Sequence, residues 1–337
     1  MSPRGRSPAR PGLGGVARPA GILLALLPLI ATMAVGVASA GPPPPAVTIS
    51  AQDLARAGNQ IRLLRHTLST SAVVEIVLPA RSTSRQLAMA PNGTTVALAD
   101  QYGPVAALLT LANVDGSQTR INLPGAIGAG YAPDGSWLAV IDGRGALWRV
   151  AAQSGAATLL ADGPFIGSPI VRADGSVLLL AVLSVAAPIS SNLVELDPVS
   201  GHIEGLTNEP LVYGAFLLAD GSVAVAAHEV EGTVVRRIAG TRSDLVVVLG
   251  PGAVNVAIAP DGQQIAFVRD DEVFYVERPH AAPRRLTRGR NPTFAPEGDA
   301  LLVQDGGVSV VLGRDGLQLA AFDAQAGFVA CGEGCQP

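Results

Sequence analysis

One short pattern returns six times in this chain and constrains the fold more than any other feature of the sequence. Each copy ends in Asp-Gly, Asn-Gly or Glu-Gly, and the closing glycines are Gly93, Gly135, Gly175, Gly221, Gly262 and Gly298. Successive glycines are 42, 40, 46, 41 and 36 residues apart, so the mean period is 41 residues. A sequence with such a period repeats one structural unit along its length.

Each copy predicts a tight turn between two β-strands. Asp-Gly and Asn-Gly between apolar runs favour hairpins, because these residues tolerate the positive φ that tight turns need. In the fifth copy, β-rich segments follow at residues 265–267, 273–276 and 284–287. Four short strands per repeat of about 40 residues are typical of a β-propeller blade. One blade cannot bury both faces of its sheet, so the blades are expected to stack in a ring.

The fifth copy also carries a resemblance to known proteins. The run from Ala-Pro-Asp-Gly at residues 259–262 to Arg-Leu-Thr at 285–287 resembles the repeat of TolB-like and WD-repeat-like β-propellers. It is similar as well to the propellers of LpqB-type lipoproteins and of prolyl-oligopeptidase-type enzymes. The resemblance covers residues 60–322 and implies an all-β propeller of four-stranded antiparallel blades. It implies no particular activity, because propellers host many unrelated functions.

The number of blades follows from the segments outside the six repeats. Strand-like runs occur at residues 61–65 and 73–78, and residues 328–330 resemble an inner strand. Gly334 lies 36 residues beyond Gly298, the same interval as the one before it. We therefore favour seven blades over six, with the last blade built from both chain ends so that no sheet edge stays free. Residues 48–337 are expected to form this single domain.

The first 47 residues predict export. Four arginines precede the apolar run 20–37, which ends in Ala-Ser-Ala at 38–40, as in a secretory signal peptide covering residues 1–40. The apolar run exceeds the usual ~7–15 residues, so an uncleaved membrane anchor is the alternative. The proline-rich residues 41–47 predict a stiff spacer. We expect a periplasmic, cell-envelope or extracellular protein that contacts a membrane only through an uncleaved leader.

Composition excludes several classes of function. The 23 basic residues are all arginine, so the chain has no Walker A lysine, Schiff-base lysine or Ser–Lys dyad. With 27 acidic residues the net charge is −4, which argues against a nucleic-acid partner. The chain has no Gly-x-Ser-x-Gly motif, and its four histidines form no zinc signature. We expect no catalytic set and no metal centre, which favours a non-enzymatic protein while leaving the question open.

Acidic residues recur after the second strand of the predicted blades. They are Asp100, Asp142, Glu229, Glu231, Asp270, Asp271, Glu272 and Asp305. In a propeller, the loops between second and third strands all open on one face of the ring. Carboxylates converging there would attract a cation or a basic partner. The alternative is that these acids only shape their turns, since tight loops favour aspartate.

The only two cysteines, Cys331 and Cys335, lie close together near the chain end. In an exported protein such a pair predicts a local disulfide, which would pin the turn of the closing blade. Its short loop removes little unfolded-state entropy, so its stabilisation is expected at the low end of the usual range.

These observations support three functional hypotheses. The leading one is an exported, non-enzymatic propeller without a cofactor that binds an envelope or secreted protein, or a small ligand, at one ring face. The second is a metal-dependent hydrolase or lactonase, with a cation such as calcium at the channel mouth and Asn255 and Asn291 beside the acids. The third is a membrane-anchored ectodomain of an envelope assembly.

Overall fold

The computed structural model describes residues 47–52, 61–67, 72–78, 85–91, 95–102, 106–113, 115, 117–123, 125–184, 190–208, 211–240, 242–295, 297–306, 308–322 and 324–329. Across these residues the chain forms 28 strands and no helix. No helix long and apolar enough to cross a membrane occurs in this part of the chain. The all-β prediction is confirmed.

Most strands form four-stranded antiparallel sheets in chain order. The first of these runs β4-β5-β6-β7 (Arg85–Met89, Thr95–Tyr102, Ala106–Asn113, Gln118–Ile121). The next is built from β8, β9, β10 and β11 (Gly128–Tyr131, Trp137–Ile141, Leu147–Ala151, Ala157–Ala161). Two more comprise β20 to β23 (Val254–Ile258, Ile265–Arg269, Glu272–Val276, Arg284–Arg288) and β24 to β27 (Arg290–Phe294, Ala300–Asp305, Val308–Gly313, Gln318–Phe322).

A larger sheet consists of two such units joined at one point. One unit contains β12, β13, β14 and β15 (Phe165–Val171, Val177–Ser184, Ser190–Leu196, Ile203–Gly205). The other contains β16, β17, β18 and β19 (Leu211–Leu217, Val223–Glu229, Gly232–Ala239, Arg242–Gly250). Their junction is a single parallel pair, Ser191 with Leu211, beside a hydrogen bond from the Ser191 hydroxyl to the Val212 carbonyl oxygen.

Strands from both ends of the described chain share the remaining sheet. Its order is β28-β1-β2-β3, with bounds Ala324–Val329, Val47–Gln52, Ile61–Thr67 and Ala72–Leu78. The strand-like runs expected at 61–65 and 73–78 are thus β2 and β3. Antiparallel pairing sets Val47 opposite Val329. The start of β1 and the end of β28 therefore lie side by side in this sheet.

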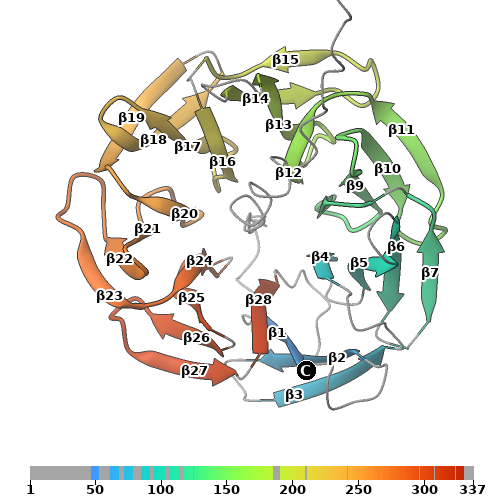
Figure 1. Cartoon of the computed structure of the whole chain (residues 1–337), viewed down its shortest axis with the longest axis horizontal. Helices are drawn as coiled ribbons and strands as arrows, with labels where there is room; N and C mark the ends of the chain where they lie inside the picture. Colours follow the sequence, from blue (N-terminus) through green and yellow to red (C-terminus); the bar gives the residue numbers. More distant parts are fainter. Residues whose placement is uncertain are drawn as a thin grey trace, which may run out of the picture.

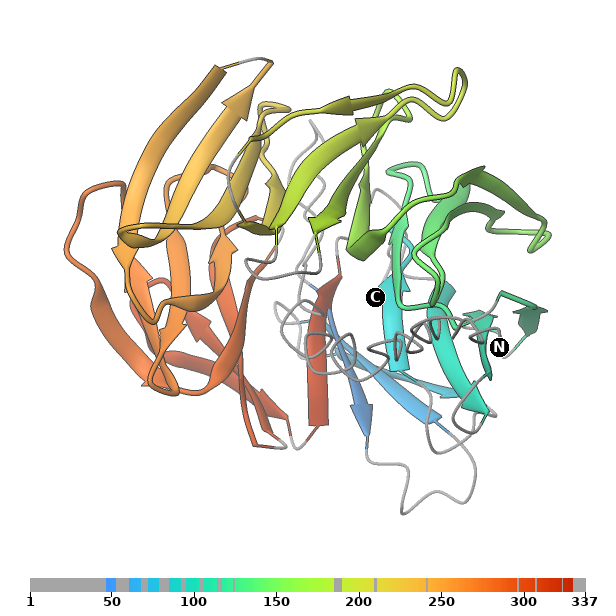
Figure 2. The same ribbon diagram turned by 45° about the horizontal axis from the view of Figure 1, so that its top comes forward.

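The sheets are arranged around a central axis. Figure 1 shows β12, β16, β20, β24 and β28 towards the middle, with β11, β19, β23 and β27 at the outside. The tilted view in Figure 2 shows neighbouring sheets facing one another around this axis.

The hydrophobic core lies between neighbouring sheets. One cluster, for example, joins Leu109 and Leu111 of β6 to Leu138 and Val140 of β9. Small residues allow close approach nearer the axis, where β8 lies against β12. A Cβ atom added to Gly128 would lie 1.8 Å from the Gly167 carbonyl oxygen. The scarcity of aromatic residues, 4% of the chain, agrees with such tight packing of backbone against backbone.

The repeated turns have the predicted positions, with a finer division of roles than expected. In the turn at residues 132–135, Gly135 has a φ of 71° and its N–H donates to the Ala132 carbonyl oxygen over 2.8 Å. Asp134 has no positive φ; its Oδ1 instead accepts the Ser136 N–H over 3.0 Å. Glycine alone therefore supplies the left-handed conformation, and aspartate stabilises the turn by accepting a hydrogen bond. In three further turns, the backbone N–H two residues after the aspartate donates the same hydrogen bond to the carboxylate; these aspartates are Asp174, Asp220 and Asp261.

Candidate functional site

The two faces of the ring carry different turns. We call the face with the turns at residues 229–232, 269–272 and 305–308 the loop face. The opposite face, with the repeated turns at 132–137, 172–176, 218–222, 259–264 and 295–300, is the turn face. The two turns that flank β21 show the separation, because β21 has five residues and so spans about 17 Å between the faces.

The structure places the eight predicted acids unevenly. Asp142, Glu231, Asp270 and Asp271 lie in turns, as expected from the sequence. The other four lie in strands, which extend further than the sequence indicated: Asp100 lies within β5, Glu229 and Asp305 end β17 and β25, and Glu272 begins β22. The side chain of Asp100, and both Cys331 and Cys335, lie outside the described part of the structure.

Three of the acids form ion pairs with arginines. Glu229 accepts hydrogen bonds from Nε and Nη2 of Arg236 at 2.7 and 3.2 Å. An Asp271 oxygen lies 2.7 Å from Nη2 of Arg290. Glu272 pairs with an arginine on the next strand, Arg285, over 2.9 Å. These carboxylates are locally neutralised, and partly exposed pairs of this kind contribute only about 0–1 kcal/mol each to stability.

The hydrogen-bond partners of the Asp142 carboxylate lie close to it in sequence, in the turn after β9 and in β10. The residue is 1% exposed. Its Oδ1 accepts the N–H groups of Arg144 and Ala146 at 2.8 and 3.0 Å, and its Oδ2 accepts the Trp148 indole N–H at 3.0 Å. Buried carboxylates need such donors, and here two donors come from the turn that connects β9 to β10 and the third from Trp148 in β10. This arrangement gives Asp142 a structural role in that turn.

Glu231, Asp270 and Asp305 remain as exposed carboxylates, and none of them has an ion pair among the residues the structure describes. Asp270 and Asp271 have φ values of 53° and 59°. Two successive residues with positive φ form a two-residue hairpin turn of type I′. This turn holds the Asp270 carboxylate at the outer end of its hairpin, in solvent.

Beside these acids, a chain of side-chain amides links two neighbouring inner strands. Asn255 in β20 donates through Nδ2 to Oδ1 of Asn291 in β24 over 3.1 Å. Asn291 donates in turn to Oε1 of Gln304 in β25 over 3.0 Å. The Asn255 Oδ1 atom is buried and has no hydrogen-bond partner among the described residues. We call these three residues the amide chain.

The backbone explains why asparagine occupies two positions of the amide chain. Asn255 and Asn291 have φ values of 47° and 50°, at irregularities where β20 and β24 lose register with their partner strands. Asparagine adopts this conformation more readily than other non-glycine residues. The two asparagines are 36 residues apart, as are Gly262 and Gly298. They therefore occupy equivalent positions of two successive repeats, and this spacing relates them in the sequence. Gln304 has no such signal in the sequence.

On β16, the next inner strand, Tyr213 packs against His228 of β17, and both side chains are partly buried. The Tyr213 and His228 rings lie 4.8 Å apart between centroids, and both side chains approach Thr233 Oγ1, at 3.4 and 3.1 Å. Burial raises the pKa of Tyr213 to about 12 and lowers the pKa of His228. Thr233 is fully buried and donates to the Ala253 carbonyl oxygen, so it is not an accessible nucleophile.

Arg269 connects two neighbouring units beside the amide chain. Its Nη2 donates to the Leu249 carbonyl oxygen of β19 over 2.5 Å, and its guanidinium carbon lies 5.3 and 5.6 Å from the ring centroids of Phe267 and Phe274. Its Nε atom is buried without a hydrogen-bond partner among the described residues. Within those residues, no group of three or more His, Cys, Asp or Glu side chains is placed to hold a metal ion.

Radial antiparallel sheets with inner strands around one axis define a β-propeller, and solved structures agree with that class. TolB from Acinetobacter baumannii is similar over 81% of this chain and 78% of its own, at 15% identity and a TM-score of 0.51. An oligogalacturonate lyase in complex with manganese is similar over 85% of each chain, at 13% identity and a TM-score of 0.57. The Cps50 (Swd1) β-propeller domain from Myceliophteria thermophila is similar over 79% of this chain and 97% of its own, at 14% identity and a TM-score of 0.54.

These similarities confirm the TolB-like and WD-repeat-like propeller expected from the repeats. At identities of 13–15% they show the fold alone. No family model matches the sequence, and no curated protein matches it.

Proposed function

We propose that this chain is an exported, non-enzymatic β-propeller that binds a protein or a small ligand on its loop face. The binding site consists of the amide chain together with the exposed carboxylates of Glu231, Asp270 and Asp305. The single observation that carries the proposal is the buried, unpartnered Oδ1 of Asn255 at this face.

A buried acceptor without a donor costs about 1–3 kcal/mol, so such atoms usually bind water or a ligand group. Asn255 is the second residue of β20, the strand that pairs with β21, and Asp270 follows the end of β21. Asn291 and Asp305 have the same relation in the next sheet, at the start of β24 and the end of β25. The amide chain therefore lies inside a border of negative charge, which favours a ligand that donates hydrogen bonds and carries positive charge.

A pull-down from envelope fractions tests the proposal with the mature chain as bait. The double variant Asp270→Asn, Asp305→Asn removes two carboxylates and keeps the shape of both side chains. The control is Asp174→Asn on the turn face, which removes one carboxylate at a distance from the site. We expect one partner to be recovered with the wild type and the control and to be lost with the double variant. Equal recovery by all three proteins would remove the loop face from the proposal.

A metal-dependent enzyme is the second candidate. The observation in its favour is again the free amide oxygen of Asn255, because hard cations prefer oxygen ligands. A fold neighbour, the oligogalacturonate lyase, was solved with manganese. Elemental analysis of the purified protein decides between the candidates: stoichiometric calcium or manganese that is lost in Asn255→Gly supports the enzyme, and a metal-free protein that still binds its partner supports the first proposal.

Two finer features of the proposal concern the chain ends. We propose cleavage after Ala40, and a mature protein that begins at Gly41 supports it, whereas an intact leader supports the anchored ectodomain. We also propose seven blades, with β28, β1, β2 and β3 as the closing blade. A chain truncated after Phe322 lacks β28 and is expected to unfold at a lower urea concentration; an unchanged midpoint would favour six blades.

A further inference from the structure

One segment of this acidic chain is strongly basic. Residues 278–296 contain five arginines and no acidic residue. Residues 41–337 carry 19 arginines and 27 acidic residues, so setting these five arginines aside leaves 14 against 27 and a net charge of −13. All five arginines are exposed, and they are Arg278, Arg284, Arg285, Arg288 and Arg290. Positive charge is therefore concentrated on one part of the molecule.

Three of the five arginines lie on β23, the outer strand of its sheet. Figure 1 shows β23 at the outside of the ring, and in the described structure this strand pairs only with β22. Alternate residues of such a strand direct their backbone N–H and C=O groups outward, where a further strand can pair. Two other outer strands, β11 and β27, carry no charged residue. An outer strand of this fold therefore does not need arginines.

Strand register places two of these arginines on the same side of the sheet. Arg285 lies opposite Phe274 and Arg288 lies opposite Glu272, with Leu286 as the extra residue of a β-bulge between them. Phe274 and Glu272 are two residues apart in β22, so their side chains point to one face. Glu272 pairs with Arg285 over 2.9 Å. Arg288 has no ion pair in the described structure, so this side of β23 keeps a positive charge.

Arg284 and Arg278 add further charge without a carboxylate partner. Arg284 donates to the Arg314 carbonyl oxygen over 2.6 Å, and its guanidinium carbon lies 4.9 Å from the centroid of the Tyr275 ring. These contacts fix the guanidinium group before a partner arrives, which lowers the entropy cost of binding. Neither Arg284 nor Arg278 has an ion pair among the residues that the structure describes.

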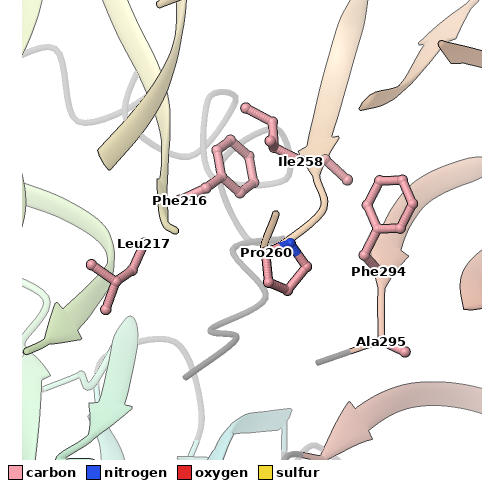
Figure 3. A pocket seen from close by; sticks show the side chains of 7 residues that line it. Phe216, Leu217, Ile258, Pro260, Phe294 and Ala295 are labelled. Carbon is pink, nitrogen blue, oxygen red and sulfur yellow. The ribbon is translucent and has the colours of Figure 1, made fainter. Parts of the chain in front are cut away.

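The cavity beside three inner strands is not an alternative site for a partner. It lies next to β16, β20 and β24, where Figure 3 shows Phe216, Ile258, Pro260 and Phe294. Its volume is about 20 Å³, which is room for one water molecule. A side chain of a partner does not fit there.

We propose that β23 binds an extended acidic segment of a partner protein. The backbone of the segment pairs with the free edge of β23, and its carboxylates accept hydrogen bonds from the guanidinium groups. The arginines oppose a neutral or basic strand, which would desolvate or repel them. A five-residue strand contacts only about 17 Å of a partner, which suits a short segment. A long polyanion or an anionic membrane is repelled by the net charge of −13 elsewhere on the chain. This site does not depend on the function proposed for the loop face.

Three labelled pentapeptides test the proposal on residues 41–337. Acetyl-Glu-Val-Glu-Val-Glu-amide is as long as β23, and its glutamates share one face when the peptide is extended. The Gln-Val-Gln-Val-Gln analogue is neutral, and the Lys-Val-Lys-Val-Lys analogue is basic. Fluorescence anisotropy measures the dissociation constants at low salt, because salt screens exposed charges. We expect the acidic peptide to bind at least about fivefold more tightly than the neutral peptide, and the basic peptide to bind least tightly.

Two double variants locate the binding. Arg285→Gln, Arg288→Gln removes one paired and one unpaired arginine from β23 and is expected to abolish the preference for the acidic peptide. The matched control, Arg120→Gln, Arg242→Gln, removes the same charges from the outer strands β7 and β19. Arg242 pairs with Asp244, and Arg120 has no ion pair in the described part of the chain. The control is expected to keep the preference.

Equal affinity for the acidic and neutral peptides, absence of binding by all three, or an unchanged preference in the β23 variant would each overturn the proposal. Tighter binding of dextran sulfate or of phosphatidylglycerol vesicles than of the acidic peptide would also overturn it, in favour of a polyanion or a membrane. The Asp270→Asn, Asp305→Asn variant is expected to bind the acidic peptide normally, which separates this result from failure of the loop-face site.

Discussion

Removal of the Asp142 carboxylate tests whether this residue stabilises its turn, as the structure indicates, or takes part in binding. In Asp142→Ala, the N–H groups of Arg144 and Ala146 and the indole N–H of Trp148 lose their acceptor. An unsatisfied buried donor costs about 1–3 kcal/mol. The Arg144 N–H and the Trp148 indole N–H are only partly buried and can regain a water, so the buried Ala146 N–H dominates, and we expect a total loss of about 1–4 kcal/mol in the free energy of unfolding.

Asparagine at the same position separates hydrogen bonding from charge. In Asp142→Asn, the side-chain oxygen still accepts the two backbone N–H groups, while its NH₂ group faces the Trp148 indole N–H. One donor then meets another, and we expect a smaller loss of about 1–2 kcal/mol. The order of stability is therefore wild type, then asparagine, then alanine.

Urea unfolding followed by tryptophan fluorescence measures these losses. The chain has two tryptophans, Trp137 and Trp148, and both lie in the sheet that contains Asp142. The control is Asp305→Ala, which removes an exposed carboxylate and is expected to change stability by less than about 0.5 kcal/mol. A loss below about 1 kcal/mol in Asp142→Ala, together with lost partner binding, would contradict the structural role and return Asp142 to the binding site.

Three further predictions concern the backbone and the turns. Gly128→Ala should lower the unfolding temperature in calorimetry and reduce the free energy of unfolding by about 1–3 kcal/mol or more, because the new methyl meets a neighbouring carbonyl; Gly205→Ala, with open space around it, should have no such effect. Asn255→Gly should retain more stability in urea than Asn255→Ala, since only glycine adopts a φ of 47° without strain. Acid titration should unfold the protein more easily as pH falls below 3.8, because the backbone hydrogen bond from Ser136 holds the pKa of Asp134 below that value; Asp134→Asn should reduce this dependence.

The sign of the acid effect follows from the direction of the shift. A carboxyl group whose pKa is lower in the folded state than in the unfolded chain contributes stability above the unfolded value, and this contribution disappears as pH falls through the folded value. Asp174 shares the shift and its main cause, a hydrogen bond from the Ser176 backbone. If stability stayed constant from pH 5 to pH 2 in the wild type, the turn hydrogen bonds would be absent in solution.

The sequence predicted the repeated turns because their interactions are local. In the turn at residues 259–264, Gly262 donates to the carbonyl three residues earlier and Asp261 accepts from the N–H two residues later. Contacts over such short separations depend on residue type and not on the rest of the fold. The strands between the turns follow from the same repeat, and their ends were the least certain part, as Asp100 within β5 shows.

The tertiary structure alone decided which acids stay free. Asp271 pairs with an arginine 19 residues away, and Asp142 is buried by its own sheet, whereas Asp270 has no ion pair in the described structure although it is adjacent in sequence to Asp271. Strand register and the approach of neighbouring sheets set these distances, and no short sequence pattern specifies them. The turn interactions could therefore be predicted from the sequence, whereas the distribution of unpaired charge required the folded ring.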